Sequence, residues 1–333
     1  MAASYGARMM AGLREIPSEA LTIRRRRCGR GFVYIGENGK PLRDEAVLSR
    51  IRSLAIPPAY EDVRIATQAN AHLQAVGRDV AGRTQYRYHS DWEHVREERK
   101  VERLDRLCET LPRIRRRISY DLRREGFPRE RVLAGVIMLI DRTHIRIGCE
   151  DYVHSGRSRG AATLLKRNAR CSGSMVRLSF NGKGGCETRC SIRSAPLAKL
   201  VTGLLRLSGR RLFQYRDSDL WRRVAAADVN AYLQEMSGDT VTAKDFRTLA
   251  ATAAAAAKLA SIEAATSPAR KRRQIAGVVK EIAEMLGNTP AVARKSYIHK
   301  RVIDAFADGT LTAIRRQTPG LSRGETAVAR LFK

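Results

Sequence analysis

The stretch KRNARCSGSMVRLSFNGKGGCETRCSI, residues 166–192, decides how this chain of 333 residues is organised. It holds three short strand-like runs, KRNARC, MVRLSF and CETRCSI, which are separated by the strings SGS and NGKGG. Glycine-rich strings between such runs are typical of the tight turns that join antiparallel strands. The stretch therefore predicts a three-stranded antiparallel insert, with Lys183 at the tip of its second turn.

Helical patterns flank this insert on both sides. Before it, DWEHVREERKVERLDRLCETL and PRERVLAGVIMLIDRTHI repeat their apolar residues at helical spacing. After Ser194 we expect helices throughout, including VAAADVNAYLQEM, a helix capped by Thr242 that contains TAKDFRTLAATAAAAAKLA, and a long helix from Pro268 to Leu286. Residues 90–333 are therefore predicted to form a mostly helical domain that carries the small sheet.

The pattern is different in residues 1–89. GFVYIGENGKPL alternates apolar and polar residues around Asn38-Gly39, which predicts a hairpin. A short helix is expected at about Asp44–Leu54, EDVRIA reads as a strand, and HLQAVGRDVAGRTQYRYH reads as two strands around a turn at Gly82. The chain is thus predicted to be α+β, with a β-rich domain over residues 1–89 and a helical domain over residues 90–333.

The charge of the chain indicates its partner. Lys and Arg number 63 against 34 Asp and Glu, which gives a formal net charge of +29. Phosphate backbones attract such a surface by Coulomb steering and counterion release, so we expect a nucleic-acid partner. No apolar run is long enough to cross a membrane, and the six cysteines form no CxxC pair. These features predict a cytoplasmic protein with free thiols and no metal site.

The candidate chemistry comes from cations and one late tyrosine. The chain has no GxxxxGK[ST], HExxH, GxSxG or GxGxxG motif, which removes support for ATP and zinc mechanisms. It has cationic side chains at turns and helix starts, and a tyrosine in the basic string ARKSYIHKR. Cleavage of a phosphodiester without metal needs a nucleophile, cations on the phosphoryl oxygens, and an acid for the leaving oxygen. Tyrosine, arginine and lysine can supply all three.

Four strings occur in the order IRIGCEDY, FNGKGG, KDFRT and LGNTPAVARKSY. Together they resemble the type IB DNA topoisomerases of the compact bacterial and poxvirus kind, and SLAIPPAYEDVRIA and GRDVAGRTQYRYH resemble the amino-terminal DNA clamp of that family. The resemblance implies an enzyme that relaxes supercoiled duplex DNA by cutting one strand, allowing rotation and religating. It also implies a monomer clamped around double-stranded DNA, associated with the nucleoid, with no metal, ATP or other cofactor.

The resemblance assigns roles to individual residues. Tyr297 would be the nucleophile that becomes linked to the 3′ phosphate, and Lys183 would be the general acid for the 5′ oxygen. Arg146 and Arg247 would bind the non-bridging oxygens. Asn288 stands where the family often has histidine, and its amide can donate a hydrogen bond but cannot carry a charge. The clamp positions that would contact DNA are Gln85, Tyr86 and Tyr88.

Other interpretations remain open from sequence alone. Each of these residues, taken singly, has an ordinary structural interpretation: Asn288 could simply end a helix before a new one starts at Thr289-Pro290, and the clamp residues could be cross-strand packing residues. A tyrosine recombinase shares the chemistry, but it usually shows HxxR where this chain has KDFR ending at Arg247. A non-catalytic architectural DNA-binding protein would explain the charge equally well, but it does not explain the ordered strings.

Overall fold

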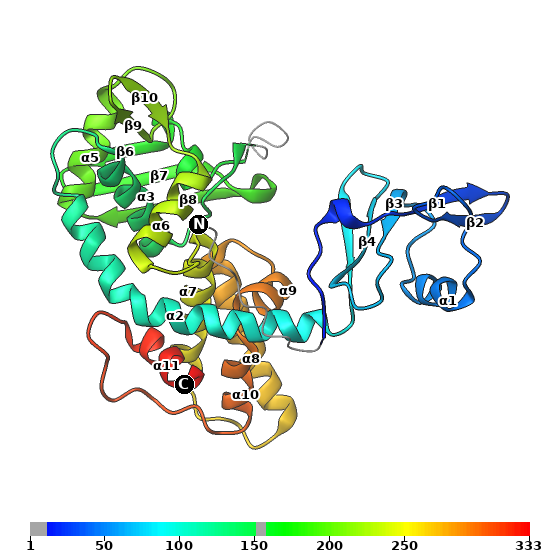
Figure 1. Cartoon of the computed structure of the whole chain (residues 1–333). Helices are drawn as coiled ribbons and strands as arrows, with labels where there is room; N and C mark the ends of the chain where they lie inside the picture. Colours follow the sequence, from blue (N-terminus) through cyan, green and yellow to red (C-terminus); the bar gives the residue numbers. More distant parts are fainter. Residues whose placement is uncertain (1–11, 151–157) are drawn as a thin grey trace. The chain divides into compact units, whose positions relative to one another are not determined.

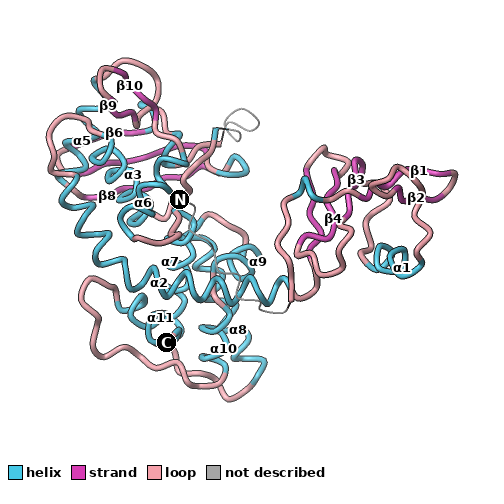
Figure 2. Tube along the Cα trace, viewed as in Figure 1, coloured by secondary structure: helices cyan, strands magenta, loops and turns pink. Residues whose placement is uncertain are grey.

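A computed structural model describes residues 12–150 and 158–333 of the chain. The chain divides into two compact units, Met1–Arg99 and Lys100–Lys333, and their boundary falls within the long helix α2 (Trp92–Asp121) (Figure 1). The overall class is α+β, as predicted. Strands dominate the first unit, whereas the second is mostly helical and carries two small sheets (Figure 2).

The first unit is built on a five-stranded antiparallel sheet. Its order is β2-β1-β3-β4-β5, with β1 (Ile23–Cys28), β2 (Gly31–Ile35), β3 (Glu61–Ile65), β4 (Leu73–Arg78) and β5 (Thr84–Tyr88). Helix α1 (Glu45–Ser53) begins at Asp44, whose carboxylate accepts two backbone N–H bonds, and packs Ile51 against the sheet. The predicted helix, the strand EDVRIA and the turn at Gly82, where φ is +71°, are all confirmed.

The predicted hairpin at Asn38-Gly39 is wrong in its second strand. The chain turns there, with φ of +74° at Gly39, but only an isolated bridge from Ile35 to Pro41 follows. Proline has no N–H to donate to a ladder, and beyond it the Leu42 N–H still donates to the Tyr34 carbonyl at 2.8 Å without forming a regular strand. The real hairpin pairs β2 with the arginine-rich strand β1, where the Arg25 guanidinium lies over the Phe32 ring.

The second unit packs its helices around one continuous apolar core. The helices are α3 (Arg129–Thr143), α5 (Ala195–Arg206), α6 (Ala226–Ser237), α7 (Ala243–Leu259), α8 (Pro268–Leu286), the short α9 (Pro290–Val292), α10 (Lys300–Ala307) and α11 (Arg323–Phe332). The alanine-rich α7 is buried along most of its length, because small side chains let neighbouring helices approach closely. Among the described residues, no helix is long and apolar enough to cross a membrane.

The predicted three-stranded insert is confirmed. It comprises β6 (Ala169–Ser172), β7 (Met175–Asn181) and β8 (Glu187–Arg193), in the order β6-β7-β8 and antiparallel throughout. Apolar side chains of β7 alternate inward, with Val176, Leu178 and Phe180 buried. The inward face packs beside α3 and α5 (Figure 1). The β7–β8 turn is a short 3₁₀ turn, Lys183–Gly185.

The expectation that the chain after Ser194 is entirely helical is wrong between α5 and α6, and residues 310–322 are also not helical. Strands β9 (Gln214–Asp217) and β10 (Leu220–Arg223) form a two-stranded hairpin, with Ser218 at φ +54° in its turn. The string FQYRDSDLWRR alternates buried Phe213 and Tyr215 with polar residues and contains a turn-forming Asp-Ser-Asp. That period of two, rather than the surrounding helical period, determines the local structure.

Candidate active site

The loop after α3 is locked by close backbone packing. Helix α3 ends at His144, which has the left-handed φ of +56°, and the chain then runs through Arg146 to Gly148. The carbonyl of Arg146 accepts a 2.8 Å hydrogen bond from the N–H of Ala161. A Cβ on Gly160 would lie only 2.4 Å from that carbonyl oxygen, so only glycine fits there. This fixes the backbone from which the half-buried Arg146 side chain extends.

Helix α7 presents Arg247 near its start. Thr242 is the N-cap residue, as predicted, and the Asp245 carboxylate accepts hydrogen bonds from its N–H and its hydroxyl. Arg247 is 4% exposed and donates to the carbonyls of His144 and Leu286, the latter at 3.1 Å. Its Nε is buried and has no hydrogen-bond partner among the described residues.

Asn288, which follows α8 in the sequence, lies in the same cluster as Arg146 and Arg247. That helix ends at Gly287, with φ of +60°, and the Asn288 N–H donates to the carbonyl of Ala283. The Asn288 Oδ1 accepts a hydrogen bond from the Arg146 guanidinium. Its Nδ2 is buried and has no partner among the described residues. Asn288 therefore follows the helix end, as the structural interpretation expects, and also offers a free donor in the cluster.

Tyr297 ends a π-helical turn, Ala293–Tyr297, in which the N–H of Ile298 donates to the carbonyl of Ala293 at 2.9 Å. The turn follows α9, whose N-cap is Thr289. Turns of this kind occur often at functional sites. The half-buried Tyr297 ring lies under the Arg247 guanidinium, with 5.2 Å between Cζ and the ring centroid. Four predicted residues from separate segments thus meet: Arg146, Arg247, Asn288 and Tyr297.

The cluster is electropositive, and no carboxylate of the described residues balances its two arginines. Neither Arg146 nor Arg247 forms an ion pair with any carboxylate in the described part of the chain. Burial lowers the pKa of Arg247, and the charge of Arg146 lowers it further. Burial alone would raise the pKa of Tyr297, but the charges of Arg247 and Arg146, with a hydrogen bond from Arg247, bring it below its ordinary value. The arrangement favours an anion near the phenol, and favours the phenolate itself.

Lys183 is not brought into this cluster. It is exposed at the β7–β8 turn, and its ammonium forms no hydrogen bond or ion pair with the described residues. Gly184 and Gly185 follow it at φ of +76° and +77°, a backbone conformation that side chains resist. The turn therefore presents the lysine to solvent on a hairpin tip.

The three predicted clamp residues lie on β5, an edge strand. Tyr86 and Tyr88 are 49% and 42% exposed and stack with their ring centroids 6.2 Å apart, so they share one face of the strand. Trp92 continues the row, 6.2 Å from Tyr88. Gln85 is half-buried and donates to the Asp79 carboxylate at 3.0 Å. The tyrosines are therefore available to a ligand, whereas Gln85 is held by its neighbour.

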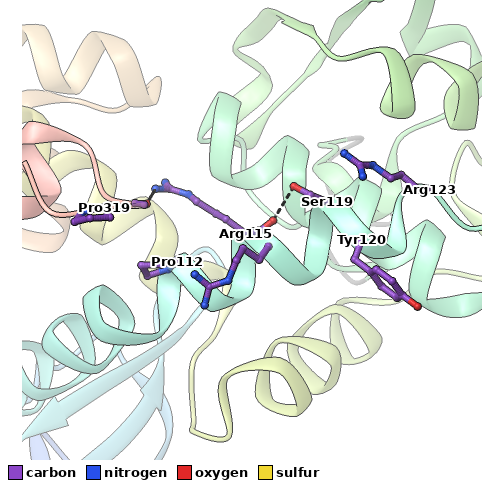
Figure 3. Close-up of a pocket in the computed structure, with 8 residues that line it drawn as sticks. Pro112, Arg115, Ser119, Tyr120, Arg123 and Pro319 are labelled. Atoms are coloured by element: carbon purple, nitrogen blue, oxygen red, sulfur yellow. Dashed lines mark hydrogen bonds between the residues drawn. The ribbon is translucent and has the colours of Figure 1, made fainter.

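A surface hollow of about 410 Å³ lies elsewhere, between α2 and the segment at Pro319-Gly320 (Figure 3). Its Arg115 donates to the Gly320 carbonyl at 3.0 Å and forms ion pairs with Asp141 and Glu325. Arg115 therefore joins α2 to α3 and α11, and two carboxylates already match its charge.

Sequence reasoning missed Thr252, whose buried hydroxyl contacts the backbone of Tyr297. It also gave no reason to expect the carbonyl of His144 as a support for Arg247. The only signal for Thr252 was a hydroxyl residue inside an otherwise alanine-rich helix. Every residue has a backbone carbonyl, so the sequence cannot show which carbonyl will accept a hydrogen bond from Arg247.

This chain is similar in sequence to known DNA topoisomerases. The family described as eukaryotic DNA topoisomerase I, catalytic core, matches residues 89–323. The family described as bacterial DNA topoisomerase IB, N-terminal domain, matches residues 31–79. A DNA topoisomerase 1B from Acanthamoeba polyphaga mimivirus is 30% identical over 298 residues, which cover 85% of this chain and 87% of the viral protein.

Proposed function

Since the chain belongs to the type IB DNA topoisomerases, we propose that Tyr297 is its nucleophile and that the surrounding cluster is its cleavage site. The enzyme relaxes supercoiled duplex DNA by transient cleavage and religation of one strand. This family membership does not favour a tyrosine recombinase or a purely architectural protein. We also propose a role in the reaction for each residue of the cluster and for Lys183.

The proposed reaction transfers one phosphoryl group twice. The Tyr297 phenol gives its proton to solvent water and its oxygen attacks the phosphorus, and the bond from phosphorus to the 5′ oxygen breaks. The products are a 3′-phosphotyrosyl bond and a 5′ hydroxyl, whose proton comes from the Lys183 ammonium. Arg146 and Arg247 neutralise charge on the non-bridging oxygens of the transition state, and the Asn288 amide donates to one of them. Religation reverses each step after the strand has rotated.

The observation that carries this proposal is the Tyr297 ring lying under the Arg247 guanidinium, with 5.2 Å from Cζ to the ring centroid. The charges of Arg247 and Arg146, neither of which forms an ion pair with a described carboxylate, also lower the pKa of the phenol. A phenol with an ordinary pKa near 10 is a poor nucleophile at neutral pH, and adjacent cations improve it. A duplex substrate that loses a short strand on cleavage should trap the covalent adduct. After proteolysis, we expect nucleotide on the peptide that contains Tyr297 and none in Tyr297→Phe. Nucleotide on another peptide would defeat the assignment.

Lys183 is proposed as the general acid, delivered by its hairpin tip. Glycines on both sides allow the backbone to come close to DNA and to withdraw between cycles. Lys183→Ala should cleave an ordinary substrate slowly but recover on a substrate with a 5′-bridging sulfur, because a thiolate leaves without a proton. Lys199→Ala, which removes an exposed lysine on α5, should behave as wild type on both. Absence of sulfur rescue would exclude the acid role.

Residues 1–89 are proposed to act as the DNA clamp of residues 90–333, the catalytic domain. The exposed edge strand β5 can enter a major groove, where Tyr86 and Tyr88 would contact the duplex. We propose a contact for Gln85 as well, although its bond to Asp79 would have to be exchanged. We further propose that one chain suffices, without metal or nucleotide, and that it works on the nucleoid in the cytoplasm.

A further inference from the structure

Thr252 is a fully buried threonine on α7 whose hydroxyl lies against the backbone of the proposed nucleophile. The hydroxyl is 3.0 Å from the Tyr297 carbonyl oxygen and 2.8 Å from the carbonyl oxygen of Thr248, and it can donate to either. It also accepts a 3.2 Å hydrogen bond from the N–H of His299. One side chain therefore contacts the backbone on both sides of Ile298.

The backbone around Ile298 needs such a partner. The π turn ends at Tyr297 and α10 begins only at Lys300, so the Tyr297 carbonyl and the His299 N–H fall between two helical segments. Ile298 and His299 are 2% and 3% exposed. Backbone polar groups buried in this way require a hydrogen-bond partner, because water is excluded. The Thr252 hydroxyl oxygen accepts from the His299 N–H, and its one hydrogen can be donated to the Tyr297 carbonyl.

Thr252 also shares a helix with Arg247. The two residues are five positions apart on α7, which corresponds to about 7.5 Å along the helix axis. Arg247 contacts the Tyr297 ring from this helix, and Thr252 holds the Tyr297 backbone from the same helix. Because helix α7 contacts both the ring and the backbone of Tyr297, it fixes the position of the phenol relative to the Arg247 guanidinium.

We propose that Thr252 is a positioning residue for the cleavage reaction, holding the Tyr297 phenol in register with Arg247. The inference rests on the proposed role of Tyr297 as nucleophile. Thr252 contacts neither DNA nor the reacting atoms. It acts through the backbone of Tyr297, so its loss changes how well the phenol meets the cations without removing any of them. Those cations are Arg247 and Lys244 from α7 and Arg146 from the loop after α3.

Thr252→Val tests this, because valine keeps the shape and removes only the hydroxyl. We expect single-turnover cleavage about tenfold slower at neutral pH, which is the size of one buried hydrogen bond, with unchanged DNA affinity. As the phenol moves away from Arg247, its pKa should return toward its ordinary value. The rising limb of the rate against pH should therefore shift to higher pH. Thr252→Ser, which restores the hydroxyl, should recover both the rate and the limb.

Thr326→Val is the matched control. Thr326 is also fully buried, donates to a carbonyl four residues earlier, that of Ser322, at 2.9 Å, and accepts from the N–H of Thr318 at 3.0 Å. Thr326→Val should lower the free energy of unfolding as Thr252→Val does. The rising limb of its cleavage rate against pH should stay where it is in the wild type. A limb unchanged in Thr252→Val, or shifted equally in Thr326→Val, would overturn the inference. If the wild-type adduct still maps to Tyr297, that result leaves the proposed nucleophile intact.

Discussion

The environment of Asn288 supports the role proposed for it, which the identity of the residue alone leaves open. Its Oδ1 is taken by Arg146, whereas its Nδ2 is buried without a partner among the described residues. A buried donor without an acceptor costs free energy, so such a group in a native protein calls for an explanation. A phosphate oxygen placed between Arg146 and Arg247 would provide the acceptor. The sequence identified the residue, but only the fold shows which of its atoms is available.

Removal of that donor should slow cleavage without weakening binding. Asn288→Ala is expected to cut a trapped-product duplex about 10²-fold more slowly, as when a donor is removed from an oxyanion site. Asn288→His, which can donate and carry a charge, should be faster than the alanine variant. Single-turnover rates and a filter-binding affinity for each variant make the comparison. Wild-type cleavage by Asn288→Ala would show that the free amide has no part in the reaction.

At the scale of elements, hydrophobic period predicted most of the secondary structure but not the contacts between its parts. The three-stranded insert, α7 and α8 lie where the pattern placed them. The β9–β10 hairpin was missed because its short period-two pattern lies between strongly helical segments. Nor could the sequence show that α11 packs onto α7 so closely that a Cβ on Gly324 would lie 2.2 Å from the Ala253 carbonyl oxygen.

Two glycines in helices should respond oppositely to alanine. Gly324→Ala introduces a methyl where there is no room, so we expect the free energy of unfolding to fall by about 1–3 kcal/mol. Gly277→Ala on α8 meets nothing within 4 Å, and it should raise the same quantity by about 0.5–1 kcal/mol. Urea unfolding of both variants measures the two changes in unfolding free energy. Equal effects would mean that the α7–α11 contact does not constrain the helix.

Arg115 joins α2 to α3 and α11 and should control the response of the protein to acid. Burial would raise the pKa of Glu325, but Arg115 holds it below its ordinary value. This contribution to stability is therefore present above about pH 4.5 and is lost as pH falls through the lowered pKa. Glu325 also accepts from the N–H of Ser322, so it ties the start of α11 as well.

Arg115→Met should reverse that dependence. Asp141 and Glu325 would be left as buried carboxylates without a cation, and the pKa of Glu325 should rise because the guanidinium that lowers it is gone. We expect a loss of about 3–5 kcal/mol in unfolding free energy at pH 7, and a smaller loss at pH 5, where protonation relieves the buried charge. Denaturant titrations of the wild type and the variant at pH 7 and pH 5 test whether the loss is smaller at the lower pH. A loss of the same size at both would contradict this role for Arg115.

For the whole molecule, charge and the order of short strings predicted the function better than any single residue did. The net charge of +29 indicated a polyanion, and the ordered strings identified the family. The convergence of Arg146, Arg247, Asn288 and Tyr297 could not be calculated from the sequence, because it depends on long-range packing between α3, α7 and α8. Lys183 lies outside the cluster, so the acid role proposed for it requires the β7–β8 turn to approach the bound phosphate.

The most direct test of this account is relaxation of supercoiled plasmid in EDTA without ATP, by the wild type and by Tyr297→Phe. We expect the wild type to relax positive and negative supercoils alike, because torsion in the DNA drives rotation and no metal takes part in the proposed chemistry. Tyr297→Phe should bind the plasmid equally well and relax none of it. Relaxation by Tyr297→Phe, or a wild-type requirement for magnesium or ATP, would contradict the central claim.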